Sequence, residues 1–270
     1  MVNRIQSPYN VGNVIIKPED LYGRNHDLDM LETFVFQTSA HVQVIGERKF
    51  GKTSFIRSFI EKIRCQSQSK LLIYCDISQF LCQKWVDFYI SILRETHEQL
   101  CDEREVLIDK IIEFISLSYR GTPPMQFQNR FIEELSNSQL SDAILLGIFL
   151  RYFQALKRYN ISAILFLDEI AVALHHFEGN ELYFSHLREL AMNKEHYDVT
   201  IVIADRRSHY EIAPERDASP GLNFITQIIH MGLIEENEAQ RLIKKPAKDA
   251  PIPVEFTNDE VSFMLWQFFY

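Results

Sequence analysis

One segment restricts the fold of this chain more than any other, because an apolar run, a loop with two glycines and a helix-like stretch follow one another directly. The run His41-Val42-Gln43-Val44-Ile45 predicts a buried strand. Residues 46–53 then read Gly-Glu-Arg-Lys-Phe-Gly-Lys-Thr, which matches the pattern G-x-x-x-x-G-K-[ST]. Apolar residues at positions 55, 56, 59, 60 and 63 follow at helical spacing. The segment therefore predicts a strand, a tight loop and a helix that begins at the loop.

Such a loop binds anions through its backbone, because its N–H groups and the N-terminus of the next helix point toward one spot. Lys52 is predicted to reach the terminal phosphates of a nucleotide and to act in catalysis, and the Thr53 hydroxyl to hold Mg²⁺. We expect these residues to contact the nucleotide: Gly46, Glu47, Arg48, Lys49, Phe50, Gly51, Lys52, Thr53 and Ser54. The alternative is an ordinary strand-to-helix turn with a lysine there by chance. For Arg48 and Lys49, solvent exposure is an equal alternative.

A second acidic motif follows a later apolar run. Residues 164–167 read Ile-Leu-Phe-Leu and place Asp168 at the carboxyl end of a predicted strand, where open α/β sheets bind their ligands. Asp168 is therefore the predicted magnesium carboxylate, and the adjacent Glu169 is the predicted general base for an attacking water. The alternative is a solvated Asp-Glu pair that caps the next helix.

A polar group also follows the predicted strand 199–204. Asp205 stands directly after it and is predicted to sense the terminal phosphate as a third catalytic residue, after Glu169 and Lys52. Arg206 or Arg207 could stabilise charge that builds up in a transition state. A turn with solvated charges is an equal alternative at this position.

Strand-like and helix-like segments alternate along the chain. Five strands are predicted, at residues 41–45, 71–75, 163–167, 199–204 and 227–231. Several are continuous apolar runs, which is typical of a parallel sheet covered on both faces. The sequence thus predicts an α/β fold, a three-layer αβα sandwich around a parallel five-stranded sheet. A long helical insert, at about 83–159, separates the second and third strands.

Composition limits the classes of protein that remain. The 270 residues are 46% hydrophobic, enough for one large domain with or without a small appendage. The formal net charge of −9 argues against a surface built mainly for nucleic acid. The four cysteines have no C-x-x-C spacing, and neither a signal peptide nor a membrane span is seen. We therefore expect a soluble, cytoplasmic protein.

Several of these motifs together resemble the AAA-like and STAND-type P-loop ATPases, of the ASCE class and similar to archaeal ATPases. Tyr22-Gly23-Arg24 with residues 27–31 resembles their N-terminal G-R-x-x-E-L-x-x-L motif, although Asp27 replaces the more usual Glu. Residues 46–53 resemble their Walker A loop and residues 166–169 their Walker B motif. Residues 232–246 resemble the start of their helical lid.

The resemblance implies ATP and Mg²⁺ as cofactors, with Tyr22, Gly23 and Arg24 on the adenine side of the nucleotide. It also implies three parts: an N-terminal arm and helix (1–35), a P-loop ATPase core (36–232) and a partial helical lid (233–270). The last residues, 266–270, read as an apolar helix without a cap, so the lid is expected to be shortened. Either another subunit covers that end or the chain is a fragment of a longer ancestor.

The leading functional prediction is a Mg²⁺-dependent ATPase that works as a nucleotide-driven switch. A protein partner, or self-assembly through the lid and the helical insert, would receive the signal. One alternative is a regulatory subunit that binds ATP or ADP and hardly turns it over. Another is a DNA-associated ATPase of the origin-loading or transposition-helper kind, which the acidic balance disfavours. No membrane partner is expected.

Overall fold

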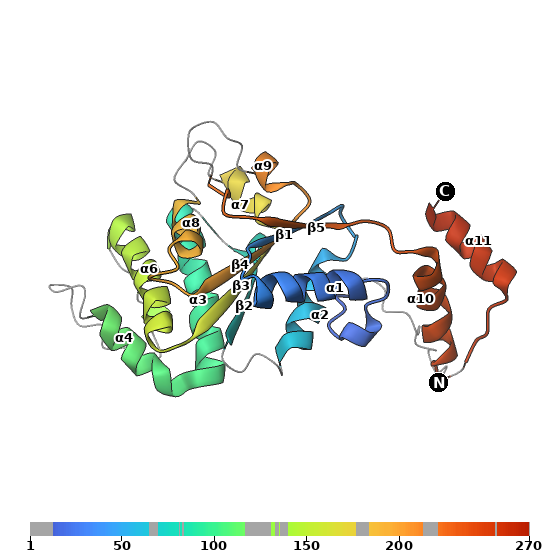
Figure 1. Cartoon of the computed structure of the whole chain (residues 1–270), viewed down its shortest axis with the longest axis horizontal. Coiled ribbons are helices and arrows are strands. Elements are labelled where there is room, and N and C mark those ends of the chain that lie inside the picture. The colour runs from blue at the N-terminus through green and yellow to red at the C-terminus, as the bar shows by residue number, and fades with distance from the viewer. Residues whose placement is uncertain are drawn as a thin grey trace, which may run out of the picture.

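Five strands form one parallel sheet, in the order β2-β3-β4-β1-β5 (Figure 1). The computed structural model describes residues 13–64, 70–80, 82, 84–116, 131–132, 135, 140–176, 184–212, 221–251 and 253–269, with backbone only at 174–176 and 267–269. The strands are β1 (Val42–Gly46), β2 (Lys70–Asp76), β3 (Ser162–Asp168), β4 (Val199–Asp205) and β5 (Gln227–Met231). The predicted parallel five-stranded sheet is confirmed.

Helices cover both faces of the sheet (Figure 1). On one face lie α1 (Asn25–Glu32), the π-helical turn η2 (Thr33–Gln37) and α2 (Lys52–Arg64). On the other lie α3 (Trp85–Arg104), α4 (Ile108–Ser116), α6 (Asp142–Arg158) and α8 (Ser185–Met192). Shorter elements are η1 (Pro18–Asp20), η3 (Ile77–Gln79), η4 (Glu105–Leu107), α7 (Ala171–His176) and α9 (His209–Ile212). The three-layer α/β sandwich expected from the sequence is therefore present.

The alternation of side chains along each strand explains why one continuous apolar run serves two cores. In β3, Ile164 and Phe166 point toward α2, whereas Leu165 and Leu167 point toward α3 and α6. All four side chains are at most 1% exposed. Both faces of β3 are thus buried, which fixes the position of this strand between two helical layers.

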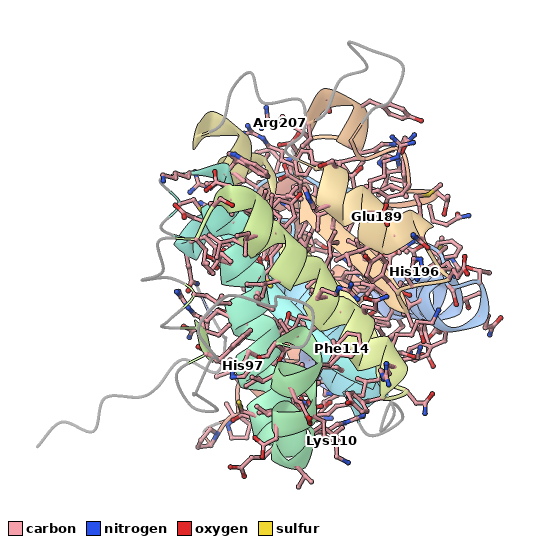
Figure 2. All side chains as sticks on the ribbon, turned by 90° about the vertical axis from the view of Figure 1, so that its left-hand side faces the viewer. His97, Lys110, Phe114, Glu189, His196 and Arg207 are labelled. Atoms are coloured by element: carbon pink, nitrogen blue, oxygen red, sulfur yellow. The ribbon has the colours of Figure 1, made fainter. Side chains whose placement is uncertain are left out.

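The described helices of the predicted 83–159 insert are α3, α4 and α6, and they lie on the face of the sheet opposite α2. Aromatic side chains join α3 to α6, with 4.9 Å between the ring centres of Tyr89 and Phe149. His97 of α3 and Tyr152 of α6 form a buried hydrogen bond of 3.0 Å. Figure 2 looks onto this layer, where α6 runs in front of α3 and Phe114 of α4 lies beside it. These aromatic residues build the core.

Two further helices stand apart from the sheet, α10 (Glu236–Lys248) and α11 (Asn258–Phe269) (Figure 1). They share a small core of Ala239, Val261 and Leu265, and Ile243 packs against it. We call these two helices the lid. No helix in the described ranges has the length and apolar character needed to cross a membrane.

The order of the strands brings the polar residues of the sequence motifs to one edge of the sheet. Because the sheet is parallel, all carboxyl ends lie on the same side. Strand β4 lies between β1 and β3, with Ile45 opposite Asp205 and Asp168 opposite Ala204. Asp76 at the end of β2 is opposite Asp168. Segments as far apart in sequence as Ile45 and Asp205 therefore meet beside the loop that follows β1.

Candidate functional site

The loop between β1 and α2 curls because two of its residues have left-handed backbone conformations. Lys49 has φ 70° and Gly51 has φ 83°. The Phe50 N–H donates to the Glu47 carbonyl at 3.2 Å, and the Phe55 N–H donates to the Gly51 carbonyl at 2.8 Å. The second bond belongs to the first turn of α2, so the helix begins at the loop. This is the arrangement that the sequence pattern predicts for an anion-binding loop.

Lys52 is the basic side chain of the loop that points inward. It is buried, and its Nζ donates to the carbonyl oxygens of Gly46 (2.9 Å) and Glu47 (3.2 Å). Among the described residues, no carboxylate oxygen lies within 4 Å of this ammonium group. Arg48 and Lys49 are exposed. The charge of Lys52 is therefore held inside the loop by weak neutral acceptors that a phosphate can replace.

Thr53 and Asp168 meet directly, although 115 residues separate them in sequence. The Thr53 hydroxyl donates to Asp168 Oδ2 at 2.6 Å, and the Tyr74 hydroxyl donates to the same oxygen at 3.0 Å. The other carboxylate oxygen, Oδ1, is buried and has no hydrogen-bond partner among the described residues. Buried polar atoms are normally paired, so an unpaired one needs an explanation. A hard cation that takes oxygen ligands, such as Mg²⁺, fits this hydroxyl and carboxylate pair.

Burial is the main influence on the protonation of this group. It raises the pKa of Asp168, and the hydrogen bonds from Thr53 and Tyr74 act in the opposite direction. Burial and then the nearby Asp168 carboxylate raise the pKa of Tyr74, so the tyrosine keeps its proton and acts as a donor. Tyr74 was not among the residues predicted from the sequence. The signal lay in the alternation of β2, where Leu72 and Tyr74 share the face that packs on α2.

Glu169 has an unusual backbone for its residue type. Its φ is 57°, and its N–H donates to the Ala204 carbonyl at 2.9 Å. Left-handed conformations of non-glycine residues cost energy and concentrate at functional sites. Its side chain is half-buried, and burial raises the pKa of its carboxyl group. A higher pKa makes a carboxylate a stronger base, which suits the predicted role.

Asp205 lies at the same edge of the sheet, but its carboxylate is occupied. Oδ2 accepts the Ala171 N–H at 2.7 Å, and Oδ1 accepts the N–H groups of Arg206 (2.7 Å) and Arg207 (3.1 Å). The side chain is 2% exposed. These contacts tie the end of β4 to the start of α7, so they give Asp205 a positioning role whatever its part in catalysis.

A buried glutamine holds the turn after Asp205. Gln43 of β1 donates through Nε2 to the Arg207 carbonyl at 2.9 Å. Its Oε1 accepts the His209 N–H at 2.8 Å and lies 2.9 Å from His209 Nδ1. The sequence predicts Gln43 only as a member of an apolar strand, without a role of its own. Its amide is the group that fixes the turn beside the loop.

The Tyr22-Gly23-Arg24 motif lies where the core meets the lid. The Gly23 N–H donates to Glu238 Oε2 of α10 at 3.1 Å, and the Arg24 guanidinium donates to the Gly232 carbonyl. Gly232 follows Met231, whose Cβ lies only 3.0 Å from where a side chain on Gly46 would begin. The motif and the start of the loop therefore both adjoin the end of β5. This placement suits contacts with the base end of a nucleotide.

Ser54 contacts the N-terminal arm. Its Oγ accepts the Ile15 N–H at 3.1 Å, and Ser58 Oγ donates to the Ile15 carbonyl at 3.2 Å. These two bonds hold the arm along α2. Ser54 thus has a structural contact beside its predicted place in the nucleotide site.

Comparison with known proteins gives structural matches to this chain but no sequence match. Neither protein-family models nor curated proteins matched the sequence. Among solved structures, the Walker-type ATPase PABY2304 of Pyrococcus abyssi superposes with a TM-score of 0.64 over 94% of this chain, at 12% identity. The chain has the fold of P-loop ATPases. The ORC2 protein of Aeropyrum pernix, in its ADPNP–ADP complexes, gives 0.56 over 91% of this chain, at 11% identity. Domain III of the Thermotoga maritima replication initiation protein DnaA gives 0.50 over 92%, at 12% identity.

The chain is shorter than the proteins it resembles. It spans 65% of the Pyrococcus chain, 56% of the Aeropyrum chain and 79% of the Thermotoga domain. At these identities the likeness concerns the fold, and the activity is argued from the site itself.

Proposed function

We propose that this protein binds ATP with Mg²⁺ and hydrolyses it, and that hydrolysis drives a switch between the core and the lid. The observation that carries the proposal is the buried, unpaired Oδ1 of Asp168 beside the Thr53 hydroxyl, next to an anion-binding loop. A loop that binds phosphate and a site for a hard cation, side by side, suit a metal–polyphosphate complex. The choice of adenine follows from the likeness of the N-terminal motif to that of AAA-like ATPases.

Each residue of the site has a part in this function. The N–H groups of residues 47–52 and the Lys52 ammonium bind the phosphates, and Lys52 exchanges its two carbonyl acceptors for phosphate oxygens. Thr53 and Asp168 would hold Mg²⁺, which neutralises charge on the phosphates when bound. Glu169 accepts the proton of the attacking water, and Arg207, which is half-buried whereas Arg206 is exposed, is the candidate for a cationic group after β4.

The switch that we propose depends on the contact between the lid and the N-terminal motif. Glu238 of the lid accepts a hydrogen bond from Gly23, and the neighbouring Arg24 donates to Gly232 at the end of β5, next to the loop. A nucleotide base at Tyr22 would add contacts on both sides of this junction. The lid would therefore be held more firmly in the ATP state than in the empty state. A protein partner, or another copy of the chain, would read this difference.

The test is release of phosphate from ATP with Mg²⁺, followed beside the binding of ATP by calorimetry. The wild type should bind and release phosphate. Glu169→Gln should still bind ATP but lose hydrolysis by about a hundredfold or more, the share that general base catalysis supplies. Lys52→Ala should lose binding, whereas Lys110→Ala should match the wild type because Lys110 lies at the end of the molecule opposite Arg207 (Figure 2). Tight binding without release would instead support a regulatory subunit, and no binding at all would overturn the proposal.

A DNA-associated ATPase is the second candidate, because basic residues of α10 gather at helical spacing on one side of the helix. These line a shallow hollow on the lid: Arg241, Lys244, Lys245 and Lys248. One structural neighbour is a replication initiation protein. Anisotropy of a labelled DNA duplex should then rise on binding and fall steeply with salt. The Lys244→Glu/Lys248→Glu variant should abolish the rise and Lys110→Glu should not; equal binding by both variants would contradict this function.

A further inference from the structure

A tyrosine outside the two sequence motifs contacts the carboxylate at their centre. Tyr74 lies on β2, the strand next to β3, and is opposite Phe166 in the sheet register. Asp168 is two residues after Phe166 on β3, and side chains two residues apart on a strand point to the same face. Tyr74 and Asp168 therefore both leave the sheet on the face covered by α2. Thr53 is in the first turn of α2. Three elements therefore converge on one carboxylate.

The two hydroxyl groups bind the carboxylate unevenly. Thr53 and Tyr74 both donate to Oδ2, at 2.6 Å and 3.0 Å, and Oδ1 receives no hydrogen bond from the described residues. Two donors on one oxygen fix the rotation of the carboxylate about its last bond. They leave the other oxygen free to bind a cation. A neutral hydroxyl also adds no positive charge that would repel the cation, unlike a lysine or arginine in the same place.

A cation–π contact holds the tyrosine in turn. The guanidinium carbon of Arg57 lies 3.5 Å above the centre of the Tyr74 ring. Arg57 is on α2, one helical turn after Thr53, so the same helix supplies the hydroxyl on one side and the stacked cation on the other. Tyr74 and Arg57 also line a cavity of about 590 Å³, together with residues of η3 and α3. The ring is therefore anchored by contacts that are independent of the nucleotide.

We propose that Tyr74 is a positioning residue for the metal site, which orients Asp168 so that Oδ1 faces the bound Mg²⁺. The inference rests on the proposed function, because it assumes a cation at Asp168. Partners that orient metal ligands are worth roughly 10- to 100-fold in metal affinity in well-studied sites. Removal of the Tyr74 hydroxyl should therefore weaken the metal and leave the phosphate contacts of the loop intact.

The experiment measures metal binding without turnover. Mn²⁺ is titrated into the complex of the protein with ADP, and bound Mn²⁺ is followed by electron paramagnetic resonance. Tyr74→Phe keeps the ring for Arg57 and removes only the hydroxyl. It should lower Mn²⁺ affinity about tenfold, with ADP affinity in EDTA unchanged. Tyr159→Phe is the matched control, because it removes a hydroxyl that bonds at 3.3 Å to the Lys110 carbonyl on an exposed surface.

A double-mutant cycle distinguishes orientation of Asp168 from a general loss of structure. In an Asp168→Asn background, Tyr74→Phe should have no further effect on Mn²⁺ affinity, because the carboxylate that it orients is gone. If the two losses add instead, Tyr74 does not act through Asp168. Arg57→Gln should give a smaller loss than Tyr74→Phe and serves as the second variant if the phenylalanine protein does not fold.

The outcomes separate this inference from the function on which it rests. If the wild type binds Mn²⁺ with ADP and Tyr74→Phe binds it equally well, the positioning role is overturned and the proposed function stands. If the wild type binds ADP with no difference between Mn²⁺ and EDTA, the metal site itself is absent and both are overturned.

Discussion

At the scale of single residues, Gly51 is the position where backbone geometry alone decides the side chain. Its φ of 83° lies in the left-handed region, yet a Cβ built there meets no atom within 4 Å. Any cost of a larger residue is therefore conformational strain and not a collision. The loop of residues 46–53 needs this freedom to turn its amide groups inward.

We predict that Gly51→Ala destabilises the protein by about 1–2 kcal/mol, the cost of a left-handed alanine, and weakens ATP binding. Gly232→Ala is the matched control, since a Cβ there also has open space and its φ is outside the left-handed range. Urea unfolding and calorimetry measure the two effects. Equal stability of the two variants would show that the loop relaxes at no cost.

His41 gives a second prediction at this scale. Burial, with a contribution from Lys194, lowers the pKa of His41 from its ordinary 6.5 to about 4. The Ile201 N–H donates to Nδ1, and Nε2 lies 3.2 Å from the Ala191 carbonyl. The folded protein thus keeps the ring neutral, whereas the unfolded chain protonates it below pH 6.5. The stability that the neutral ring supplies is complete above pH 6.5 and is lost as the pH falls toward 4.

The expected loss is about 3 kcal/mol of unfolding free energy across that range. His41→Gln should flatten this part of the curve, because glutamine can accept and donate in the same directions without titrating there. His196→Gln, at an exposed position, should leave the curve unchanged. Unfolding in urea between pH 4 and 7 provides the comparison, and parallel curves for wild type and His41→Gln would refute the assignment.

At the scale of elements, Asp205 shows how strand ends and helix starts are joined. Its buried carboxylate accepts N–H groups from α7 and from the turn after β4. Asp205→Ala should cost about 2–4 kcal/mol, because one buried and two partly buried N–H groups lose their acceptor. Urea unfolding without nucleotide tests this. Asp102→Ala on the exposed side of α3 should change stability by less than about 0.5 kcal/mol.

The same measurement bears on the predicted catalytic role of Asp205. A residue that only senses phosphate should leave the stability of the empty protein unchanged when it is replaced. A large loss of stability without nucleotide would show that Asp205 acts first by holding β4 and α7 together. No loss would leave the sequence-based prediction as the better account.

At the scale of the whole molecule, few contacts join the lid to the core in the part of the chain that the structure describes. The lid has its own small core, and the Gly23–Glu238 hydrogen bond and the cation–π contact between Lys245 and the Tyr22 ring cross the junction. A unit held this way opens more easily than the sheet. The switch that we propose depends on this difference.

We predict that Glu238→Ala speeds hydrogen exchange in α10 and α11 by about tenfold to a hundredfold, the loss expected for a hydrogen bond to a charged group. Exchange in the strands should not change. Glu236→Ala on the same turn is the control, since Glu236 contacts only Gln240 of its own helix among the described residues. Mass spectrometry of exchanged peptides measures both. Unchanged exchange in the lid of Glu238→Ala would mean that other contacts hold it.

The sequence by itself determined the parts of this protein that depend on neighbouring residues along the chain. The loop, the five strands and the acidic residues at strand ends were readable because spacing and apolar runs are local signals. The tertiary structure alone decided the strand order, with β4 between β1 and β3. It also decided that Tyr74 meets Asp168 and that Asp205 is occupied by backbone N–H groups. These two contacts join residues 94 and 34 positions apart, and they depend on which strands become neighbours in the sheet, which the local apolar pattern of each strand does not specify.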